Sequence, residues 1–329
     1  MKIYAYDVRE DEREAFVRVG EDCGVELVLD AEAPTPETAG RAAGCVGVSS
    51  LGQKKITWEV LKRWKELGVQ CYSTRTISYN HVDLEAALDL GFKVCNANYP
   101  PNGVADFSVM MILLCLRNYK QTMSRGLAND FTLKGLQGRN MNALTIGVMG
   151  TGRIGRQVIR NLSGFGCRIL AYDIQENEET KALAQYVDAD TIYRECDVIT
   201  LHMPWVSATG NIINRESIAK MKDGVILVNC ARGELTETQA LIEAVESGKI
   251  GALGIDTLKG EEGIIHQDHR TESIVNRDWF YLHQFSNVVM TQHMAFYTRE
   301  AVESMVRCGV EGIVQMAQTG SCPNMLRKA

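Results

Sequence analysis

The sequence lacks the features that would direct it to nucleic acid or into a membrane. Its 35 basic and 41 acidic residues give a formal net charge of −6, with no cluster of either sign. This balance argues against nucleic acid and anionic membranes as partners. The most apolar run, FSVMMILLCL at 107–116, is too short to span a bilayer, which requires about 20 residues. The charged N-terminus, MKIYAYDVRED, does not resemble a signal peptide, so we expect a cytoplasmic protein.

Cysteine motifs for metals or redox chemistry are also missing. The ten cysteines include no CxxC pair, which argues against a zinc knuckle and a thioredoxin-like site. They lie within apolar runs, as is typical of reduced core residues in a cytosolic protein. The segment HQDH at 266–269 has the histidine spacing of a metal site, but it lies in a polar stretch with no third ligand nearby. We therefore expect no bound metal.

The chain is rich in short apolar runs that alternate with amphipathic stretches. Its 329 residues suffice for two domains, since a domain usually has about 100–200. Alternating strands and helices favour a parallel sheet that is covered on both faces. NANYPPNG at 96–103 has the composition of a hinge, and a long helix is expected over 103–126. The strand candidates are 3–7, 25–29, 45–50, 70–74, 92–97, 144–149, 168–173, 197–203, 225–230, 251–256 and 288–291.

The segment LTIGVMGTGRIGRQVIRNL, 144–162, is the most informative one. Gly150, Gly152 and Gly155 form GxGxxG between a predicted strand and a predicted helix. In that context the pattern indicates a dinucleotide site, although a merely structural glycine-rich turn is the alternative. The first glycine permits a tight turn, the second lets backbone approach a pyrophosphate, and the third lets helix pack on strand. The helix N-terminus then offers N–H groups to the phosphates.

An acidic residue follows at the distance that such a site requires. Asp173 ends the next predicted strand, 18 residues after Gly155. A carboxylate there accepts hydrogen bonds from the ribose hydroxyls of NAD and repels the 2′-phosphate of NADP. Ile174 and Gln175 come next, so no arginine is placed to hold that phosphate. We therefore expect NAD as the cofactor, in the second of two domains.

Polar side chains follow three later strands. Arg232 comes after VILVNC, Asp256 and Glu261 come after GALGI, and His293 comes after VVMT. Ligands of a doubly wound sheet bind outside the carboxyl ends of its strands, where these side chains should lie. An arginine can bind a carboxylate bidentately, and a histidine can exchange a proton with a carbonyl or alcohol. A glutamate beside that histidine would orient the ring and favour its protonated form.

These residue types suit hydride transfer between a nicotinamide and a 2-oxo or 2-hydroxy acid, but simpler interpretations are open. His293 could be a polar residue where a strand ends. Arg232 could form a surface ion pair. Glu261 could be a solvated loop acid, since Glu262 beside it is equally acidic.

From STRTISYNHVD onward the sequence resembles the D-2-hydroxyacid dehydrogenase family, in particular its D-lactate dehydrogenase-like branch, over nearly the whole chain. The blocks that carry the resemblance are TRTISYNHVD (74–83), NANYPPNGVADFSV (96–109), GVMGTGRIGR (147–156), DVITLHMP (197–204), MKDGVILVNCARGEL (221–235), GIDTLKGEEG (254–263) and NVVMTQHMAFYT (287–298).

The resemblance implies two doubly wound parallel-sheet (Rossmann-like) α/β domains separated by a cleft. Residues 1–99 plus 297–329 would form a flavodoxin-like substrate (catalytic) domain, and residues 100–296 the NAD-binding Rossmann domain. The implied reaction is reduction of a 2-oxo acid to a D-2-hydroxy acid by NADH. The helix expected over 103–126 resembles the dimerisation element of the family, so we expect a homodimer.

The resemblance also assigns roles to residues. Arg232 would bind the substrate carboxylate, His293 would be the acid/base, and Glu261 its partner. The chain departs from the family at Lys259, which opens the block EGE, and at Gln292, which replaces the proline before the histidine. His202 would lie near the cofactor without being the acid/base. Cofactor-binding residues besides Gly150, Gly152, Gly155 and Asp173 would be Val104, Arg153, Ile154, Met203, Pro204, Thr209, Cys230, Ala231 and Asp256.

The substrate-binding residues implied in the same way are Leu51, Ile77, Ser78, Tyr99 and Phe296. The family usually has a glycine where Ser78 stands, which leaves the backbone contact to the substrate carboxylate open. Leu51 replaces a tyrosine of some lactate-specific members, which suggests room for a branched or aromatic side chain.

Two alternatives share this fold: an NAD-sensing corepressor or scaffold, and a formate or phospho-hydroxyacid dehydrogenase. Formate enzymes have glutamine where Glu261 stands, and a phosphate would need basic residues that the sequence does not offer.

Overall fold

The computed structural model describes residues 1–52 and 54–328. The chain divides into two compact units, which are considered separately below. Unit 1 consists of Met1–Pro100 with Tyr297–Ala329, and unit 2 of Pro101–Phe296. Each unit has one sheet with parallel strands and helices packed against it, so the α/β class predicted from the alternating pattern is confirmed.

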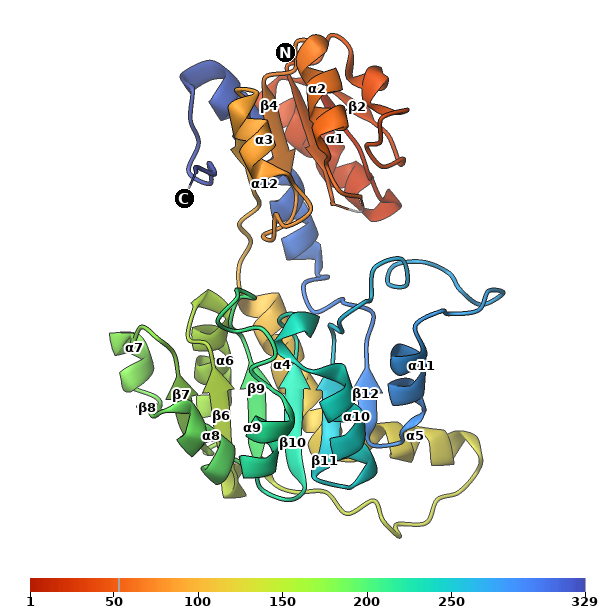
Figure 1. Ribbon diagram of the computed structural model, residues 1–329, viewed down its shortest axis with the longest axis vertical. Helices are drawn as coiled ribbons and strands as arrows, with labels where there is room; N and C mark the ends of the chain where they lie inside the picture. The colour runs from red at the N-terminus through yellow and green to blue at the C-terminus, as the bar shows by residue number, and fades with distance from the viewer. Residues whose placement is uncertain (53, 329) are drawn as a thin grey trace. The chain divides into compact units, whose positions relative to one another are not determined.

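Unit 1 is built on a five-stranded sheet of order β2-β1-β3-β4-β5 (Figure 1). Its strands are β1 (Lys2–Ala5), β2 (Glu26–Leu29), β3 (Gly47–Ser50), β4 (Cys71–Thr74) and β5 (Lys93–Cys95). Its helices are α1 (Arg13–Cys23), α2 (Trp58–Glu66), α3 (Leu84–Asp89) and α12 (Arg299–Thr319), with 3-10 turns η1 (Glu10–Glu12) and η2 (Ala39–Ala42). The C-terminal helix expected from the sequence is thus present, and it returns to this sheet.

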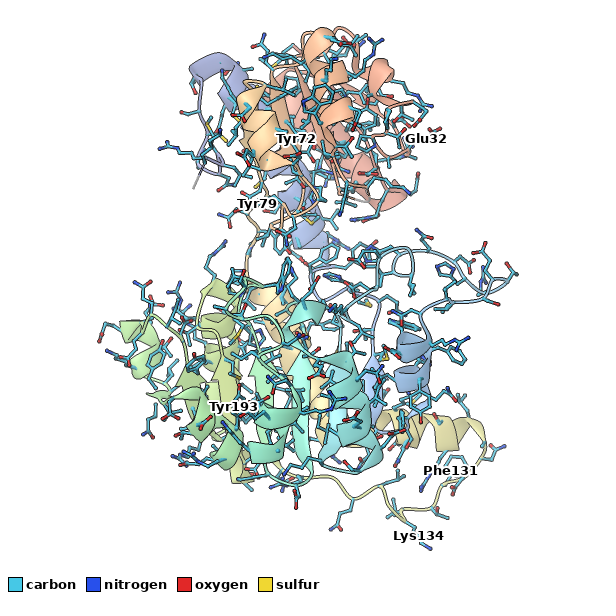
Figure 2. All side chains as sticks on the ribbon, viewed as in Figure 1. Glu32, Tyr72, Tyr79, Phe131, Lys134 and Tyr193 are labelled. Atoms are coloured by element: carbon cyan, nitrogen blue, oxygen red, sulfur yellow. The ribbon has the colours of Figure 1, made fainter. Side chains whose placement is uncertain are left out.

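Two apolar layers cover the sheet of unit 1. On one face, the rings of Tyr6 and Tyr72 lie 5.8 and 5.7 Å from that of Trp64, which has no exposed surface (Tyr72 is labelled in Figure 2). On the other face, Phe16 of α1 and Ile313 of α12 pack with Ile3. Burying side chains of this size contributes about 1.5–3 kcal/mol each, which holds the discontinuous parts of unit 1 together.

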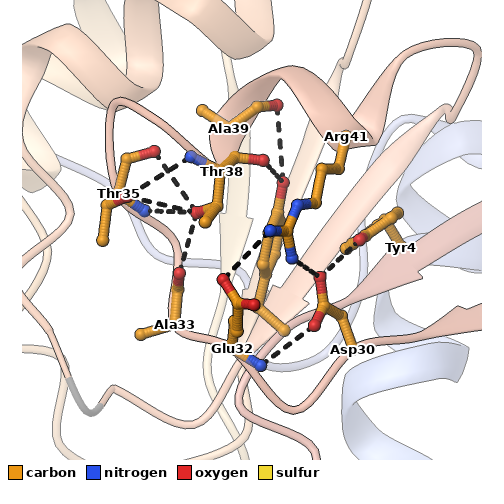
Figure 3. A network of polar contacts seen from close by, with 9 residues as sticks. Tyr4, Asp30, Glu32, Ala33, Thr35, Thr38, Ala39 and Arg41 are labelled. Carbon is orange, nitrogen blue, oxygen red and sulfur yellow. Dashed lines mark hydrogen bonds and ion pairs between the residues drawn. The ribbon is translucent and has the colours of Figure 1, made fainter.

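The loop after β2 is fixed to the sheet by a polar network (Figure 3). Asp30 accepts hydrogen bonds from the Tyr4 hydroxyl at 2.6 Å and from Arg41 Nη1 at 2.8 Å. Thr38 Oγ1 donates to the carbonyl of Ala33 at 2.8 Å. The buried Tyr6 hydroxyl donates to the carbonyl of Thr38 at 3.1 Å, and burial raises the pKa of this phenol to about 12. The loop is therefore held in place by Tyr4 of β1 and by Tyr6, which follows that strand.

Unit 2 is built on a seven-stranded sheet of order β12-β11-β10-β9-β6-β7-β8. Its strands are β6 (Thr145–Met149), β7 (Arg168–Tyr172), β8 (Gln185–Tyr186), β9 (Val198–Leu201), β10 (Val225–Asn229), β11 (Ile250–Ile255) and β12 (Val288–Met290). Its helices are α4 (Asn102–Leu116), α5 (Tyr119–Leu127), α6 (Arg153–Ser163), α7 (Glu178–Lys181), α8 (Ala189–Glu195), α9 (Arg215–Lys220), α10 (Thr238–Glu246) and α11 (Arg277–Gln284), with 3-10 turns η3 (Met141–Ala143) and η4 (Gly233–Leu235). In Figure 1, α4 passes behind this sheet, and α9 and α10 lie in front of it.

The segment 103–126 differs from the sequence prediction. It forms two helices, α4 and α5, instead of one. Asn118, which separates them, has the left-handed conformation (φ +48°) that asparagine tolerates better than most residues. α4 is largely buried, whereas α5 has no buried residue. None of the helices in residues 1–52 and 54–328 is long and apolar enough to cross a bilayer.

Candidate active site

The glycine-rich loop joins β6 to α6 through two close backbone contacts. Gly150 has φ +95°, and a Cβ there would lie 2.6 Å from the carbonyl carbon of His202. A Cβ on Gly155 would lie 1.9 Å from the carbonyl oxygen of Gly150. A Cβ on Gly152 would meet no atom within 4 Å. Two of the three glycines are therefore required by the fold itself, while Gly152 leaves open space at the start of α6.

That open space lies where a dinucleotide fingerprint needs it. α6 is an 11-residue helix that begins at Arg153, directly after Gly152. The N–H groups of its first turn have no partner within the helix and point toward the Gly152 end. Asp173, after β7, accepts hydrogen bonds from Thr151 N at 2.5 Å and from Thr151 Oγ1 at 3.1 Å. The carboxylate expected to bind ribose is thus held against the glycine-rich loop. These residues fit a bound NAD.

The loop that carries Arg232 is fixed by the residue that ends β10. Asn229 is 2% exposed; its Oδ1 accepts from Ala231 N at 3.0 Å and its Nδ2 donates to the carbonyl of Arg232 at 2.8 Å. A Cβ on Gly233 would lie 2.2 Å from the backbone of Leu258 and of Lys259. The Arg232 loop is therefore packed directly on the loop that leads to Glu261. Asn229 was not predicted from the sequence, although it is a polar residue at the end of an apolar strand.

Glu261 and His293 are in direct contact. His293 Nδ1 lies 2.6 Å from Glu261 Oε1, and Leu258 N donates to the other carboxylate oxygen at 2.9 Å. The side chains keep 15% exposure for Glu261 and 29% for His293. This contact fixes the orientation of the imidazole ring. The other ring nitrogen, Nε2, does not take part in it. Glu261 is thus more than a solvated loop acid.

Asp256 organises the loop in which His293 lies. Its Oδ1 accepts from Thr291 Oγ1 at 2.6 Å and from Met294 N at 2.9 Å, and its Oδ2 accepts from Ala295 N at 2.9 Å. The residue is 1% exposed. His293 itself has φ +51°, an uncommon backbone conformation for a residue other than glycine. The buried carboxylate offsets the cost of that conformation by accepting hydrogen bonds from the Thr291 side chain before His293 and from the two backbone N–H groups after it.

Three adjacent strands therefore bring the polar groups to one edge. β10, β11 and β12 are neighbours and parallel, and they are followed by Arg232, by Asp256 with Glu261, and by His293. β9, on the other side of β10, is followed by His202, and β6 beyond it by the glycine-rich loop. His202 Nε2 shares a hydrogen bond with Thr200 Oγ1 at 2.9 Å. Its Nδ1 is buried without a hydrogen-bond partner in the part of the chain that the structure describes.

The other residues expected at the cofactor site lie in unit 2 as well. Val104 is buried in α4, Met203 is buried after β9, and Cys230 is buried after β10. Thr209 Oγ1 donates to the carbonyl of Pro204 at 2.7 Å, which closes the loop after Met203. Ile154 and Ala231 are partly buried and Arg153 is exposed, while Phe296 ends the unit with its ring 6.3 Å from that of His266.

The residues expected to bind substrate in unit 1 are carried by loops at the carboxyl edge of its sheet. Leu51 follows β3 and is 8% exposed, with its N–H donating to Asp7 Oδ2 at 3.1 Å. Ile77 and Ser78 follow β4, and Tyr99 follows β5; all three are partly buried. Asn96 Nδ2 donates to the carbonyl of Ile77 at 2.7 Å and so fixes this loop.

The chain is similar to known proteins over nearly its whole length. The model of the D-isomer specific 2-hydroxyacid dehydrogenase NAD binding domain matches residues 109–295. An aromatic 2-oxoacid reductase of Clostridium sporogenes is 40% identical over 326 residues, which are 98% of this chain and 98% of that protein. A D-lactate dehydrogenase of Lactiplantibacillus plantarum is 34% identical over 330 residues, which are 99% of each chain.

A solved structure gives the same result for the fold and the cofactor. The D-isomer specific 2-hydroxyacid dehydrogenase of Lactobacillus delbrueckii ssp. bulgaricus, in its NAD complexed form, matches with a TM-score of 0.88 and 31% identity, over 99% of this chain and 100% of the other. The resemblance noted from the motifs and the prediction of NAD are confirmed. The chain belongs to the D-isomer specific 2-hydroxyacid dehydrogenases and is an NAD-dependent oxidoreductase.

Proposed function

We propose that this enzyme reduces 2-oxo acids with an apolar side chain larger than that of lactate, with Arg232, Glu261 and His293 as its catalytic residues. The observation that carries the proposal is the 2.6 Å contact between His293 and Glu261, at the edge where Arg232 also lies. Bound NADH supplies the hydride for the carbonyl carbon. The protein must supply the proton and hold the substrate.

His293 is the proton donor in this proposal. Nδ1–H donates to Glu261, which fixes the orientation of the ring. Nε2 then carries the proton that passes to the carbonyl oxygen of the substrate. In the reverse direction the neutral Nε2 takes the proton of the hydroxyl. Asp256 acts on this step only through the loop it holds.

Arg232 binds the substrate carboxylate. Its Nη1 donates to the carbonyl of Ala231 at 2.6 Å, and this bond holds the guanidinium against its own loop. An arginine has five N–H donors in a planar fork, so enough remain for a bidentate contact with a carboxylate. The family resemblance assigns further substrate contacts to the backbone of Ile77 and Ser78, to the side chains of Leu51 and Tyr99, and to Phe296.

The preference for a larger substrate follows from Leu51. A leucine leaves space that a tyrosine would fill, and it presents only apolar surface. The relative from Clostridium sporogenes, whose name states that it reduces aromatic 2-oxoacids, is compatible with such a pocket. We therefore expect phenylpyruvate and 2-oxoisocaproate to be better substrates than pyruvate.

The cofactor contacts are part of the same proposal. Gly152, Arg153 and Ile154 would hold the pyrophosphate, and Asp173 the ribose hydroxyls. The remaining contacts would come from the backbone and apolar surface of Val104, Gly150, Gly155, Met203, Pro204, Thr209, Cys230 and Ala231, with Asp256 close by.

NADH oxidation against pyruvate, 2-oxoisocaproate, phenylpyruvate and 2-oxoglutarate tests the proposal. His293→Ala should lower kcat by about 10²–10⁴-fold, the usual contribution of a general acid, with little change in KM. Arg232→Ala should mainly raise KM. His283→Ala serves as the control, since His283 lies on α11 and has no proposed role. Near-normal kcat in His293→Ala at neutral pH would show that another group supplies the proton.

A homodimer is the oligomeric state we propose, because unit 2 exposes three large apolar side chains within one short segment, 127–133. Phe131 projects from the loop after α5 (Figure 2) and is 79% exposed, and Leu127 and Leu133 are 86% and 84% exposed. Exposed apolar patches of this kind mark interaction sites. Light scattering should give the mass of a dimer, and Leu127→Asp with Phe131→Asp should give the monomer. Val275→Asp, at a 90% exposed site elsewhere, should leave the dimer intact.

A cytoplasmic location is proposed from the ten cysteines, all of which are free thiols. Recovery of the native protein with the cell envelope would contradict it.

A further inference from the structure

The C-terminal segment of unit 1 is paired with the edge strand β5. After Gly320 ends α12, Met325 forms an antiparallel bridge with Cys95. Leu326 N donates to the carbonyl of Val94 at 2.8 Å, and Asn96 N donates to that of Asn324 at 3.3 Å. The segment 321–328 thus covers the edge of the sheet and brings a second cysteine, Cys322, to β5.

Cys322 packs on the apolar cluster that contains Cys95, and Met325, which pairs with Cys95, donates its N–H to the carbonyl of Cys322 at 3.2 Å. The surroundings of the two thiols differ. Cys95 is 1% exposed, and a Cβ on Gly312 of α12 would lie 2.6 Å from its sulfur, so this side of the thiol is sealed by the helix. Cys322 is partly exposed. A small solute can therefore reach the pair only by way of Cys322.

The two sulfurs are chemically unequal. The neighbouring Cys95 thiol, against the effect of burial, lowers the pKa of Cys322. The neighbouring Cys322 thiol and burial together raise the pKa of Cys95. Cys71, nearby on β4, is fully buried, and burial raises its pKa to about 11. Reactive cysteines combine thiolate character with exposure, and of these three only Cys322 has both.

We propose that Cys322 and Cys95 form a peroxide-sensitive thiol pair, in which Cys322 is the attacking and Cys95 the resolving cysteine. The Cys322 thiolate attacks one peroxide oxygen, the O–O bond breaks, and the sulfur becomes a sulfenic acid as the other oxygen leaves as water after protonation. The Cys95 thiol then attacks the sulfenic sulfur, an S–S bond forms, and a second water leaves. Two thiols are oxidised to one disulfide while one hydrogen peroxide is reduced to two waters.

The disulfide ties the C-terminal segment covalently to β5. It restricts the unfolded chain more than the folded one, so the oxidised protein has the higher melting temperature. A dithiol reductant reverses the change. The inference does not depend on the proposed catalytic roles, since its readouts are a mass and a melting temperature.

Peptide mapping of the full-length protein tests the pair. The reduced protein is treated with hydrogen peroxide near neutral pH, alkylated, and digested with trypsin without reduction. The two expected peptides, 94–117 and 308–327, also contain Cys115 and Cys308. Cys115→Ser and Cys308→Ser are therefore the matched controls. After peroxide treatment, both variants should still contain the cross-link between Cys95 and Cys322 and show the higher melting temperature. Cys322→Ser should not form the cross-link.

The resolving role of Cys95 is tested by trapping. In Cys95→Ala, or in Cys95→Ser if alanine does not fold, the sulfenic acid on Cys322 should persist and be captured by dimedone. In the reduced wild type, iodoacetamide should modify Cys322 faster than the partly exposed Cys23 and Cys167, whose pKa values are raised by burial. A wild type without the cross-link, a cross-link that survives in Cys322→Ser, or one that joins Cys322 to Cys71 would overturn the proposal.

Discussion

The two units have the same construction but use charged residues differently at the carboxyl edges of their sheets. In unit 1, Arg75 follows β4 and has no exposed surface, and its guanidinium pairs with Glu12, which is also fully buried. In unit 2, Glu261 and His293 also pair, but they keep 15% and 29% exposure. One pair is sealed and the other can be reached by a ligand.

The difference lies in how much hydrogen-bonding capacity is already used. Arg75 Nε donates to Glu12 at 3.0 Å, Nη1 to Ser49 at 3.3 Å, and Nη2 to Glu12 at 3.2 Å and to the carbonyls of Tyr6 and Asp7 at 3.0 Å. Because both side chains are fully buried, this network is closed to a substrate. His293 has Nδ1 bound to Glu261 while Nε2 is not part of that bond. A buried pair with a fully enclosed network thus stabilises structure, whereas a pair that keeps exposure and a ring nitrogen outside the contact can do chemistry.

The largest expected effect comes from breaking the pair of unit 1. Arg75→Met leaves Glu12 buried without a cation, and removal of one partner of a buried pair costs about 3–5 kcal/mol. Denaturant unfolding should show a loss of this size in the free energy of unfolding. The double variant Arg75→Met with Glu12→Gln should regain part of it, because no buried charge remains. A loss below about 1 kcal/mol in the single variant would mean that Glu12 is solvated.

This contrast also shows what the sequence could predict. The glycine-rich loop and the positions of Arg232, Glu261 and His293 were found because each follows an apolar run, and parallel strands bring such positions to one edge. Arg75 and Glu12 were not found as a pair, since 63 residues separate them and neither has a local signal. β8 was missed because its two residues are too few for any periodicity.

The break in the helix 103–126 has a local cause as well. The apolar pattern continues across Arg117 and Asn118, so periodicity alone predicted one helix. The left-handed conformation of Asn118 ends α4, and no sequence rule requires it there. The role of Asp256 was likewise hidden, because its partners are backbone N–H groups about 40 residues away.

A smaller effect is expected from the pair of unit 2, and in activity more than in stability. Glu261→Gln keeps the shape and the acceptor for Leu258 N but removes the charge opposite the imidazolium. A hydrogen bond to a charged group contributes about 1.5–3 kcal/mol, so kcat should fall about 10–100-fold. The free energy of unfolding should change by less than about 1 kcal/mol, as for other exposed pairs. Steady-state kinetics and denaturant unfolding of the same sample check both values.

Glu262→Gln is the matched control for this prediction, because it removes a neighbouring charge that has no contact with His293. It should leave kcat unchanged. Equal effects of the two substitutions would mean that net charge near the site matters and that the specific contact does not. A large loss of stability in Glu261→Gln would mean that the Glu261–His293 pair stabilises the fold as the Arg75–Glu12 pair does. The two units would then not differ in how they use their charged pairs.

The smallest effect compares one partly buried histidine from each unit. Burial lowers the pKa of His81 in unit 1 to about 4 and that of His202 in unit 2 to about 3. The unfolded chain takes up a proton at each histidine below about pH 6.5, whereas the folded chain does not until the lower pKa is reached. The stability contributed by each neutral histidine is therefore present above about pH 6.5 and is lost as the pH falls. At pH 5 the loss is about 2 kcal/mol for each.

The two histidines should behave alike at pH 5, because that pH lies above both of the lowered pKa values. His81→Asn and His202→Asn should each reduce, by about 2 kcal/mol, the difference in the free energy of unfolding between pH 7 and pH 5. Denaturant unfolding at the two pH values measures this difference. If only His81→Asn reduced it, His202 would be protonated in the folded protein at pH 5. Its Nδ1 would then be open to water, and the edge of unit 2 would be accessible as far as β9, two strands beyond Glu261.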